Sequence, residues 1–381
     1  MSDRILALVY APETEALSYP PDCPFKTQRA SATRRQLLNA GLLGAPHLCE
    51  VRPQPASRAQ LERIHTPRYL DLLQRAARGE LTAEGLHAGL GGPDTPVFRD
   101  LWDYACWACG AGLTAAEIIL QGRAHIAFNL HGGFHHAHPE HAGGFCYLND
   151  VALACDFLAA AGRRVMALDL DAHHGDGVQA IFYQRSDVLT VSLHESGSTL
   201  YPGTGFEQEL GEGPGFGYNV NVPLPAGTYD AAFLKAYQTI VPSLLEAFRP
   251  EVLVVELGMD ILAGDPLTHL QMTNNVVLEI ARHLRQTGLP LLVCGGGGYQ
   301  FEPTVRGWAL AWRTLAGEEG DDAWAFGLGG AMMSTLDWVG GWRDPERPVP
   351  DELRNRVEPE LARTLETLRR IHPLLQARSA R

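Results

Sequence analysis

The chain of 381 residues contains no run of apolar residues long enough to cross a membrane, and it is poor in positive charge. A membrane-spanning helix needs about 20 consecutive apolar residues, so we expect no transmembrane segment. The 31 Lys and Arg residues are outnumbered by 44 Asp and Glu residues, and lysine occurs only at Lys26 and Lys235. Because nucleic acids and anionic membranes are bound chiefly through positive charge, a net charge of −13 predicts neither as a direct partner.

Cysteine is also scarce and follows no disulfide pattern. The chain has 7 cysteines, an odd number without the spacings of a disulfide framework. Cys106 and Cys109 form a Cys-x-x-Cys pair inside an apolar helical run with no second pair near it, so we expect no structural zinc there. Free thiols are typical of a reducing compartment, and the first residues, MSDRILALVY, lack the features of a secretory signal. The sequence therefore predicts a cytoplasmic protein.

What the sequence does contain is an alternation of short apolar runs and longer helix-like segments. The predicted strands are 5–10, 126–129, 165–169, 188–193, 218–222, 252–257 and 289–294. The predicted helices are 29–41, 97–120, 148–161, 229–248, 274–286 and 303–315. This alternation predicts an α/β fold with a mostly parallel central sheet of about eight strands, covered by helices on both faces. No linker or repeat divides the chain, so we expect one domain over 1–381, with a terminal helix and tail at 350–381.

Polar and glycine-rich motifs follow five of the predicted strands. They are NLHGGFHH from Asn129, DLDAHHGDG from Asp169, SLHESG from Ser192, ELGMD from Glu256 and GGGGY from Gly295. Ligands of parallel α/β sheets bind at the carboxyl ends of the strands. Five such motifs therefore predict one shared site.

Three side chains in these motifs have the chemistry of metal ligands. Asp171 and His173 are two residues apart, so on extended chain they face the same way, and Asp260 follows another strand of the same sheet. Carboxylate and imidazole bind zinc-like ions, and three protein ligands leave a position open for water and substrate. The alternative is that Asp171 and His173 merely cap a turn or helix.

Two adjacent histidines, His135 and His136, lie on a glycine-rich loop and are candidates for proton transfer. Each needs a partner that fixes its tautomer, and Asp169 and Asp176 flank the predicted ligands. Tyr299 follows four glycines, where its hydroxyl can donate to a developing oxyanion. Ordinary structural roles for these histidines and for the tyrosine stay open. As a set, the residues predict metal-assisted hydrolysis.

Together, the motifs resemble the histone deacetylase superfamily of zinc-dependent deacylases, over roughly residues 5–320. The matching blocks are QRAS at 28–31, GPDTPVF at 92–98, HGGFHHAHPEHAGGFCYLND at 131–150, DLDAHHGDGVQAIF at 169–182, SLH to YPGTG at 192–205, GMDILAGDPL at 258–267 and GGGGY at 295–299. Details such as DPLTHLQMT are similar to the bacterial acetoin-utilisation type and to class I members. The resemblance implies an arginase/deacetylase-like fold and a zinc-dependent deacetylase.

The resemblance implies roles for the residues that match the family's motifs. The zinc ligands would be Asp171, His173 and Asp260, and ferrous iron is a second possible ion. The catalytic residues would be His135, His136, Asp169, Asp176 and Tyr299, with His136 rather than His135 as general base and acid. The acyl-lysine tunnel and its rim would be formed by Asp94, Gly144, Phe145, Tyr201 and Leu267. Arg29 would line the channel through which acetate leaves.

Structural potassium is also implied by the resemblance. One ion would be held by Asp169, Asp171, His173, Ser192 and the Leu193 carbonyl. A second would be held by carbonyls around Phe182, Arg185 and Val188, near Tyr218.

Two residues depart from the family's pattern. Tyr201 stands where the tunnel usually has a second phenylalanine, and its hydroxyl changes an apolar wall. Glu256 stands where many members have glutamine, which adds a carboxylate that raises the negative charge of the site or is held protonated. His174 has no chemical role in this scheme, and we expect it to be structural.

The expected substrate is an acylated lysine in a protein or peptide, because Asp94 matches a residue that holds substrate backbone. A small-molecule deacetylase acting on an acetylated polyamine is the nearest alternative. An arginase-type ureohydrolase is a further one, although Leu262 stands where its second metal would require an aspartate. The last alternative is a metal-binding scaffold without catalytic activity. The oligomeric state is not predicted.

Overall fold

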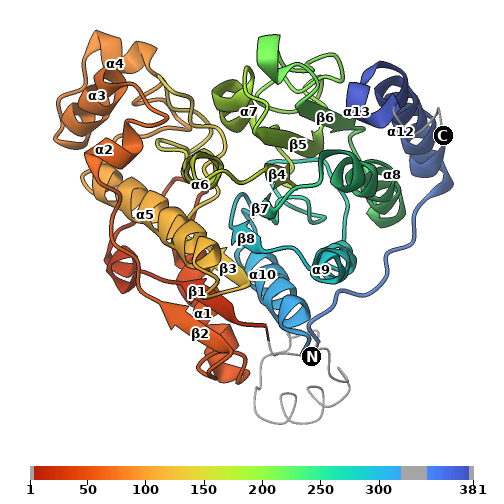
Figure 1. The fold of residues 1–381 in the computed structure, drawn as a ribbon, viewed down its shortest axis with the longest axis horizontal. Coiled ribbons are helices and arrows are strands. Elements are labelled where there is room, and N and C mark those ends of the chain that lie inside the picture. The colour runs from red at the N-terminus through yellow and green to blue at the C-terminus, as the bar shows by residue number, and fades with distance from the viewer. Residues whose placement is uncertain (1–3, 319–340, 377–381) are drawn as a thin grey trace.

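The computed structural model describes residues 4–318 and 341–376, and its centre is a sheet of eight parallel strands (Figure 1). The strands are β1 Leu6–Val9, β2 Leu48–Val51, β3 Ile126–Asn129, β4 Val165–Asp169, β5 Val188–Glu195, β6 Asn219–Leu224, β7 Val252–Glu256 and β8 Leu291–Cys294. Their order is β2-β1-β3-β8-β7-β4-β5-β6, and every neighbouring pair is parallel. The predicted parallel α/β fold is therefore confirmed.

Helices cover both faces of this sheet, which explains why its strands are apolar on both sides. One face packs against α1 Gln28–Asn39, α8 Asp230–Phe248, α9 Asn275–Thr287, α10 Phe301–Ala316, α12 Asp351–Ile371 and α13 Pro373–Gln376. The other packs against α2 Arg58–Leu61, α3 Pro67–Ala77, α5 Leu101–Leu120, α6 Asp150–Ala160 and α7 Asp176–Phe182. The short helices α4 Ala83–His87, η1 Pro12–Ala16 and η2 Gly213–Gly215 lie in the connections.

Strand β4 shows how the sequence produces this layering. Met166 and Leu168 point into one hydrophobic core and Val165 and Ala167 into the other, because successive side chains of a strand face opposite sides. The run is therefore apolar throughout until Asp169, where the strand ends. The first polar side chains appear where the chain leaves the two cores.

Strand β2 and helices α2, α3, α4 and α7 were not predicted from the sequence. The edge strand β2 is only half buried and contains Glu50, so its four residues lack a strong apolar pattern. The helices are short, and several begin at capping residues, such as Ser57 before α2 and Thr66 before α3. The terminal helix expected at 350–381 is α12, and residues 377–381 lie outside the described part. No helix among the described residues is long and apolar enough to span a membrane.

Candidate active site

The five polar motifs lie together because β3, β8, β7, β4 and β5 are consecutive neighbours in the sheet. The motif after β3 carries the two histidines and is anchored by Asp150, the first residue of α6. One carboxylate oxygen of Asp150 accepts hydrogen bonds from the backbone N–H groups of Gly133 and Phe134, both at 2.9 Å. Asp150 is fully buried, and burial raises its pKa to about 6. This carboxylate fixes the loop that presents His135 and His136.

Asp171, His173 and Asp260 form a buried cluster whose ligand atoms all lie within 4.8 Å of one another. The Nδ1 atom of His173 lies 3.1 Å from Asp171 Oδ1 and 2.9 Å from Asp260 Oδ2. Burial, together with the nearby Asp171 charge, raises the pKa of Asp260 to about 7. Burial alone would lower the pKa of His173, but its hydrogen bonds to the two carboxylates raise it to about 10.

This cluster fits a divalent metal ion. Its donors are two carboxylate oxygens and one imidazole nitrogen, a set that zinc and similar ions accept. Two carboxylates buried within 4.8 Å of each other repel, and a cation between them would remove that repulsion. Backbone also orients the ligands, because Gly297 N–H donates to Asp171 Oδ2 at 2.6 Å and Ala172 N–H to Asp260 Oδ1 at 3.0 Å. The three residues predicted as ligands are thus brought together.

Each of the two histidines pairs with one of the two carboxylates expected as partners. The Nδ1–H of His135 donates to Asp169 Oδ2 at 2.8 Å, and that of His136 donates to Asp176 Oδ1 at 2.7 Å. Both rings are buried and their centroids are 4.1 Å apart. Burial lowers the pKa of His136 to about 4, so its Nε2 is free to accept a proton. The neighbouring carboxylates, chiefly that of Glu256, overcome burial and raise the pKa of His135.

Glu256 is a buried carboxyl group, 1% exposed, and neither of its oxygens makes a hydrogen bond within the described chain. Its Oε1 lies 3.3 Å from His135 Nδ1, but the N–H of that ring is donated to Asp169. Burial raises the pKa of Glu256 well above its ordinary value. Because the pKa values of Glu256 and His135 are both raised, the pair holds a proton between them, which offsets the negative charge that Glu256 adds.

Tyr299 lies beside the metal cluster on the glycine loop that follows β8. Its ring centroid is 6.5 Å from that of His173 and 5.7 Å from that of Phe145. Its backbone N–H donates to Asp265 at 2.7 Å. Behind the loop, the buried guanidinium of Arg29 donates to the carbonyls of Gly298 at 2.7 Å and Gly296 at 3.1 Å.

The residues expected to form the tunnel lie near the two histidines and Tyr299. Asp94 accepts the Gly144 N–H through its carboxylate at 3.0 Å and the Phe145 N–H through its backbone carbonyl at 2.9 Å. Phe145 has a φ of 66°, an uncommon left-handed conformation that Asp94 helps to hold. Tyr201 is 46% exposed and its ring centroid lies 5.1 Å from that of His136. Leu267 donates its N–H to Asp265, the same carboxylate that binds the Tyr299 backbone.

Comparisons with known proteins show which proteins this chain resembles. The histone deacetylase domain matches residues 23–315. The acetoin utilization protein AcuC of Bacillus subtilis is 40% identical over 323 residues, which cover 82% of this chain and 83% of AcuC. Histone deacetylase 8 of Xenopus tropicalis is 37% identical over 324 residues, covering 83% and 87%. The crystal structure of a histone deacetylase homologue from Aquifex aeolicus is 31% identical, with a TM-score of 0.83, and covers 96% of this chain and 100% of that chain.

The chain belongs to the histone deacetylase family.

This membership confirms the enzyme class expected from the sequence, a deacetylase and hence a hydrolase. The expected arginase/deacetylase-like fold is confirmed by the similarity to the solved histone deacetylase homologues. The roles of individual residues and the identity of the metal stay predictions that the geometry makes testable.

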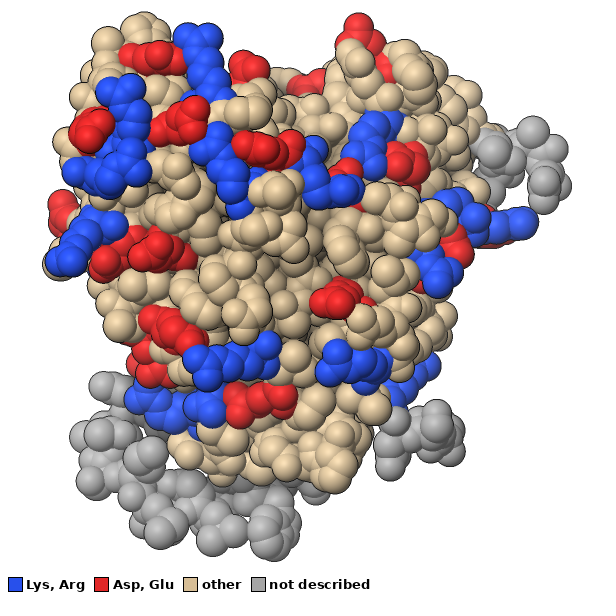
Figure 2. Space-filling model, turned by 60° about the vertical axis from the view of Figure 1, so that its left-hand side comes forward, with Lys and Arg blue, Asp and Glu red and all other residues tan. Residues whose placement is uncertain are grey.

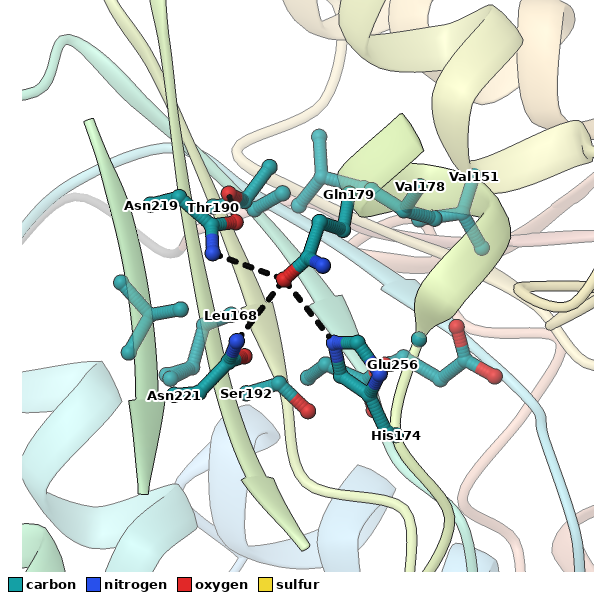
Figure 3. Close-up of a pocket in the computed structure, with 15 residues that line it drawn as sticks. Val151, Leu168, His174, Val178, Gln179, Thr190, Ser192, Asn219, Asn221 and Glu256 are labelled. Atoms are coloured by element: carbon teal, nitrogen blue, oxygen red, sulfur yellow. Dashed lines mark hydrogen bonds between the residues drawn. The ribbon is translucent and has the colours of Figure 1, made fainter. Parts of the chain in front are cut away.

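A small cavity lies among residues of β4, β5, β6 and β7 of this deacetylase (Figure 3). Asp169 and Ser192, two residues expected at the first potassium site, are among those that line it. Its volume of about 20 Å³ suits a single water-sized occupant. The Ser192 hydroxyl lies 2.7 Å from His194 Nδ1. At the other end, Gln179 Oε1 accepts from Asn219, Asn221 and His174.

His174 also contacts the Thr204 hydroxyl at 2.8 Å, which agrees with the structural role expected for it. At the second expected potassium site, the Phe182 carbonyl accepts the Arg185 N–H and the Tyr218 carbonyl accepts the Thr190 N–H. The Tyr218 carbonyl also accepts the Thr190 hydroxyl at 3.4 Å. Neither potassium prediction is tested by this geometry.

Sequence reasoning about this deacetylase missed several side chains that hold the site in place. Asp150 anchors the histidine loop, Asp265 links Leu267 to Tyr299, and His138 contacts Asp176 at 3.1 Å. The sequence offered a signal for His138, which is the third histidine of the run HHAHPEH and lies two residues after the tandem pair. Asp150 and Asp265 carried no such signal, because they hold the site mainly by accepting backbone N–H groups.

Proposed function

We propose that the chain is a metal-dependent hydrolase that removes acetyl or other acyl groups from the side-chain amine of acyl-lysine in proteins or peptides. The observation that carries the proposal is one buried cluster, Asp171, His173 and Asp260, faced by the His136–Asp176 pair and by Tyr299. Zinc is the proposed ion, with ferrous iron as the alternative, and structural potassium is proposed at the sites described above. The metal would supply Lewis acidity for the substrate carbonyl and for the attacking water.

The protein's own groups would move the protons. Water adds to the carbonyl carbon, and its proton goes to Nε2 of His136, the nitrogen that Asp176 leaves free by binding Nδ1–H. The C–N bond then breaks, and the same proton passes to the amine nitrogen. The products are a free amine and a carboxylic acid. Asp176 would stabilise the intermediate imidazolium and keep the ring in one tautomer.

Charge that develops on the carbonyl oxygen would be met by the Tyr299 hydroxyl. Burial raises the pKa of Tyr299 well above its ordinary value, so the hydroxyl keeps its proton and acts as a donor. His135, whose pKa the surrounding carboxylates raise, would add positive charge beside the reacting carbon.

The residues around this cluster suit an acyl-lysine chemically. Phe145 and Tyr201 supply aromatic surface for the methylene chain of lysine, and Asp94 is half-buried beside them with a carboxylate that can accept substrate N–H groups. The acidic composition suits a lysine-rich target. On the face in Figure 2, positive and negative side chains are interspersed, which supports the proposal that nucleic acid is not a direct partner. A cytoplasmic location is proposed from the free cysteines.

Acetylated polyamines are the second candidate substrate, because Asp94 and the Tyr201 hydroxyl would also accept hydrogen bonds from an ammonium group. The deciding experiment is a hydrolysis panel of acyl-lysine peptides and acetylpolyamines, with metal analysis of the same sample. We expect turnover of the peptides with about one catalytic divalent ion per chain. Hydrolysis of polyamines alone would refute the peptide assignment, and no loss of activity in Asp171→Ala would refute the site. His87→Ala, an exposed change in α4, is the control.

A further inference from the structure

His138 contacts the catalytic machinery from outside the predicted set of residues. Its Nε2–H donates to Asp176 Oδ2 at 3.1 Å, while Oδ1 of the same carboxylate accepts from His136 at 2.7 Å. Asp176 therefore stands between two imidazoles and binds each with a different oxygen. The side chains of His138 and Asp176 are 19% and 16% exposed, so this link joins the buried His136 to the partly open side of the site.

His138 is held through both its ring and its backbone. It stacks on His141, with centroids 4.0 Å apart and ring planes at 18°. Its backbone N–H donates to the His141 carbonyl at 2.9 Å, and its own carbonyl accepts from the buried ring of His65 at 3.0 Å. The two backbone bonds, which a side-chain change at His141 leaves in place, position His138 so that its Nε2–H points to Asp176.

The two hydrogen bonds to Asp176, from His136 and from His138, together explain how His138 affects the orientation of His136. A carboxylate bound by one donor can rotate about its terminal bond, which is a soft torsion. A second donor on the other oxygen fixes the plane of the group, and so it fixes the direction in which His136 Nδ1–H must point. The Nε2 atom of His136 is then held toward the metal cluster, since its ring lies 5.8 Å from that of His173.

We propose that His138 is a positioning residue for the deacylation proposed above: it fixes the Asp176 carboxylate and, through it, the orientation of His136. The inference rests on the proposed function for its kinetic consequence, but the hydrogen-bond chain itself does not depend on any substrate. Within the described residues, the His138 side chain bonds to Asp176 and stacks on His141, so we expect its effect to be on proton transfer.

Three variants separate this role from simple packing. His138→Phe keeps an aromatic ring on His141 and removes the donor. His138→Gln keeps a donor for Asp176. His141→Ala removes the stacking partner and leaves the bond to Asp176, which makes it the matched control. Thermal unfolding and metal content are measured for each, so that a folding defect is recognised.

Steady-state kinetics on the best acyl substrate gives the first readout. We expect kcat of His138→Phe to fall on the order of tenfold, as for other partners that orient an active-site histidine, with KM nearly unchanged. His138→Gln should recover most of the loss, and His141→Ala should behave like the unaltered protein. An unchanged kcat in His138→Phe, or an equal loss in His141→Ala, overturns the proposal.

The second readout needs no substrate. The hydrogen-bonded Nδ1–H of His136 should give a downfield proton resonance, assigned by its absence in His136→Gln. We expect that signal to shift or broaden in His138→Phe and to stay in place in His141→Ala. If no acyl substrate is hydrolysed, the proposed function fails while this signal still decides the positioning role. A signal unmoved in His138→Phe refutes the role, whatever the activity.

Discussion

Replacing Arg29 by methionine tests whether a buried cation supports the loop that carries Tyr299. The guanidinium, 3% exposed, donates to the carbonyls of Gly296 and Gly298 and lies over the Trp308 ring at 5.0 Å. These two carbonyls have no other recorded donor within the described residues. Methionine fills much of the space but leaves both oxygens unpaired.

The size of the effect follows from these contacts. An unpaired buried carbonyl costs about 1–3 kcal/mol, and two of them cost roughly twice that. Relief from burying the guanidinium charge offsets part of this loss. We therefore expect Arg29→Met to lower the free energy of unfolding by about 2–4 kcal/mol. Activity should fall as well, because the same loop carries Tyr299 and the Gly297 N–H that binds Asp171.

Urea unfolding monitored by fluorescence, together with kcat on the best acyl substrate, measures both effects. Arg35→Met is the control, because Arg35 is an exposed residue of the same helix α1. Arg29→Lys should be intermediate, since an ammonium keeps the charge but cannot bind both carbonyls as the planar guanidinium does. The reasoning fails if Arg29→Met unfolds within about 0.5 kcal/mol of the unaltered protein, the range of ordinary surface changes.

Four further outcomes are expected. Tyr299→Phe should lower kcat by on the order of a hundredfold without changing the unfolding midpoint. Tyr183→Phe, the control, should change neither quantity. Equal effects of the two substitutions would refute the role of Tyr299 as a hydrogen-bond donor. Asp94→Asn should raise KM for peptides more than for acetyl-lysine alone. An equal rise in both KM values would show that Asp94 does not bind the peptide backbone. Chelation should abolish hydrolysis and zinc should restore it; activity that survives complete metal removal contradicts the mechanism. Burial lowers the pKa of His65 to about 4, below its unfolded value of about 6.5, so its contribution to stability is present above about pH 6.5 and is lost as the pH falls toward 4. His65→Gln should weaken that dependence in acid unfolding curves, and identical curves would argue against it.

The fold was largely predictable because each central strand is buried on both sides and so reads as an apolar run. Strand β4 is apolar from Val165 to Leu168, and its boundaries agree with the prediction. Strand β2 was missed because it lies at the sheet edge, where Glu50 is exposed. Its position is set by pairing with β1, a non-local contact that a local pattern does not contain.

The candidate site was predictable where residue type and spacing carry the chemistry. Asp171, His173 and Asp260 have the atoms that bind a metal, and parallel strands bring their loops to one edge. The supporting groups were less predictable, because Asp150 and Asp265 act by accepting backbone N–H groups. Such bonds depend on loop conformation, and any acidic residue at a helix start or turn would look the same in the sequence.

The glycines of the site show why conformation matters as much as the ligands. A Cβ atom on Gly297 would lie 2.0 Å from Asp260 Oδ2, and one on Gly258 would lie 2.1 Å from Asp171 Oδ2. Both distances are far below contact range, so any side chain there would push a predicted metal ligand aside. The close approach lets the Gly297 N–H reach Asp171 at 2.6 Å. Orientation by backbone costs no side-chain entropy, because an N–H fixed by the loop has no rotamer to lose. The glycine loop after β8 thus shapes the predicted metal cluster directly, and its backbone donors share the charge of the carboxylates after β4, as a bound cation would.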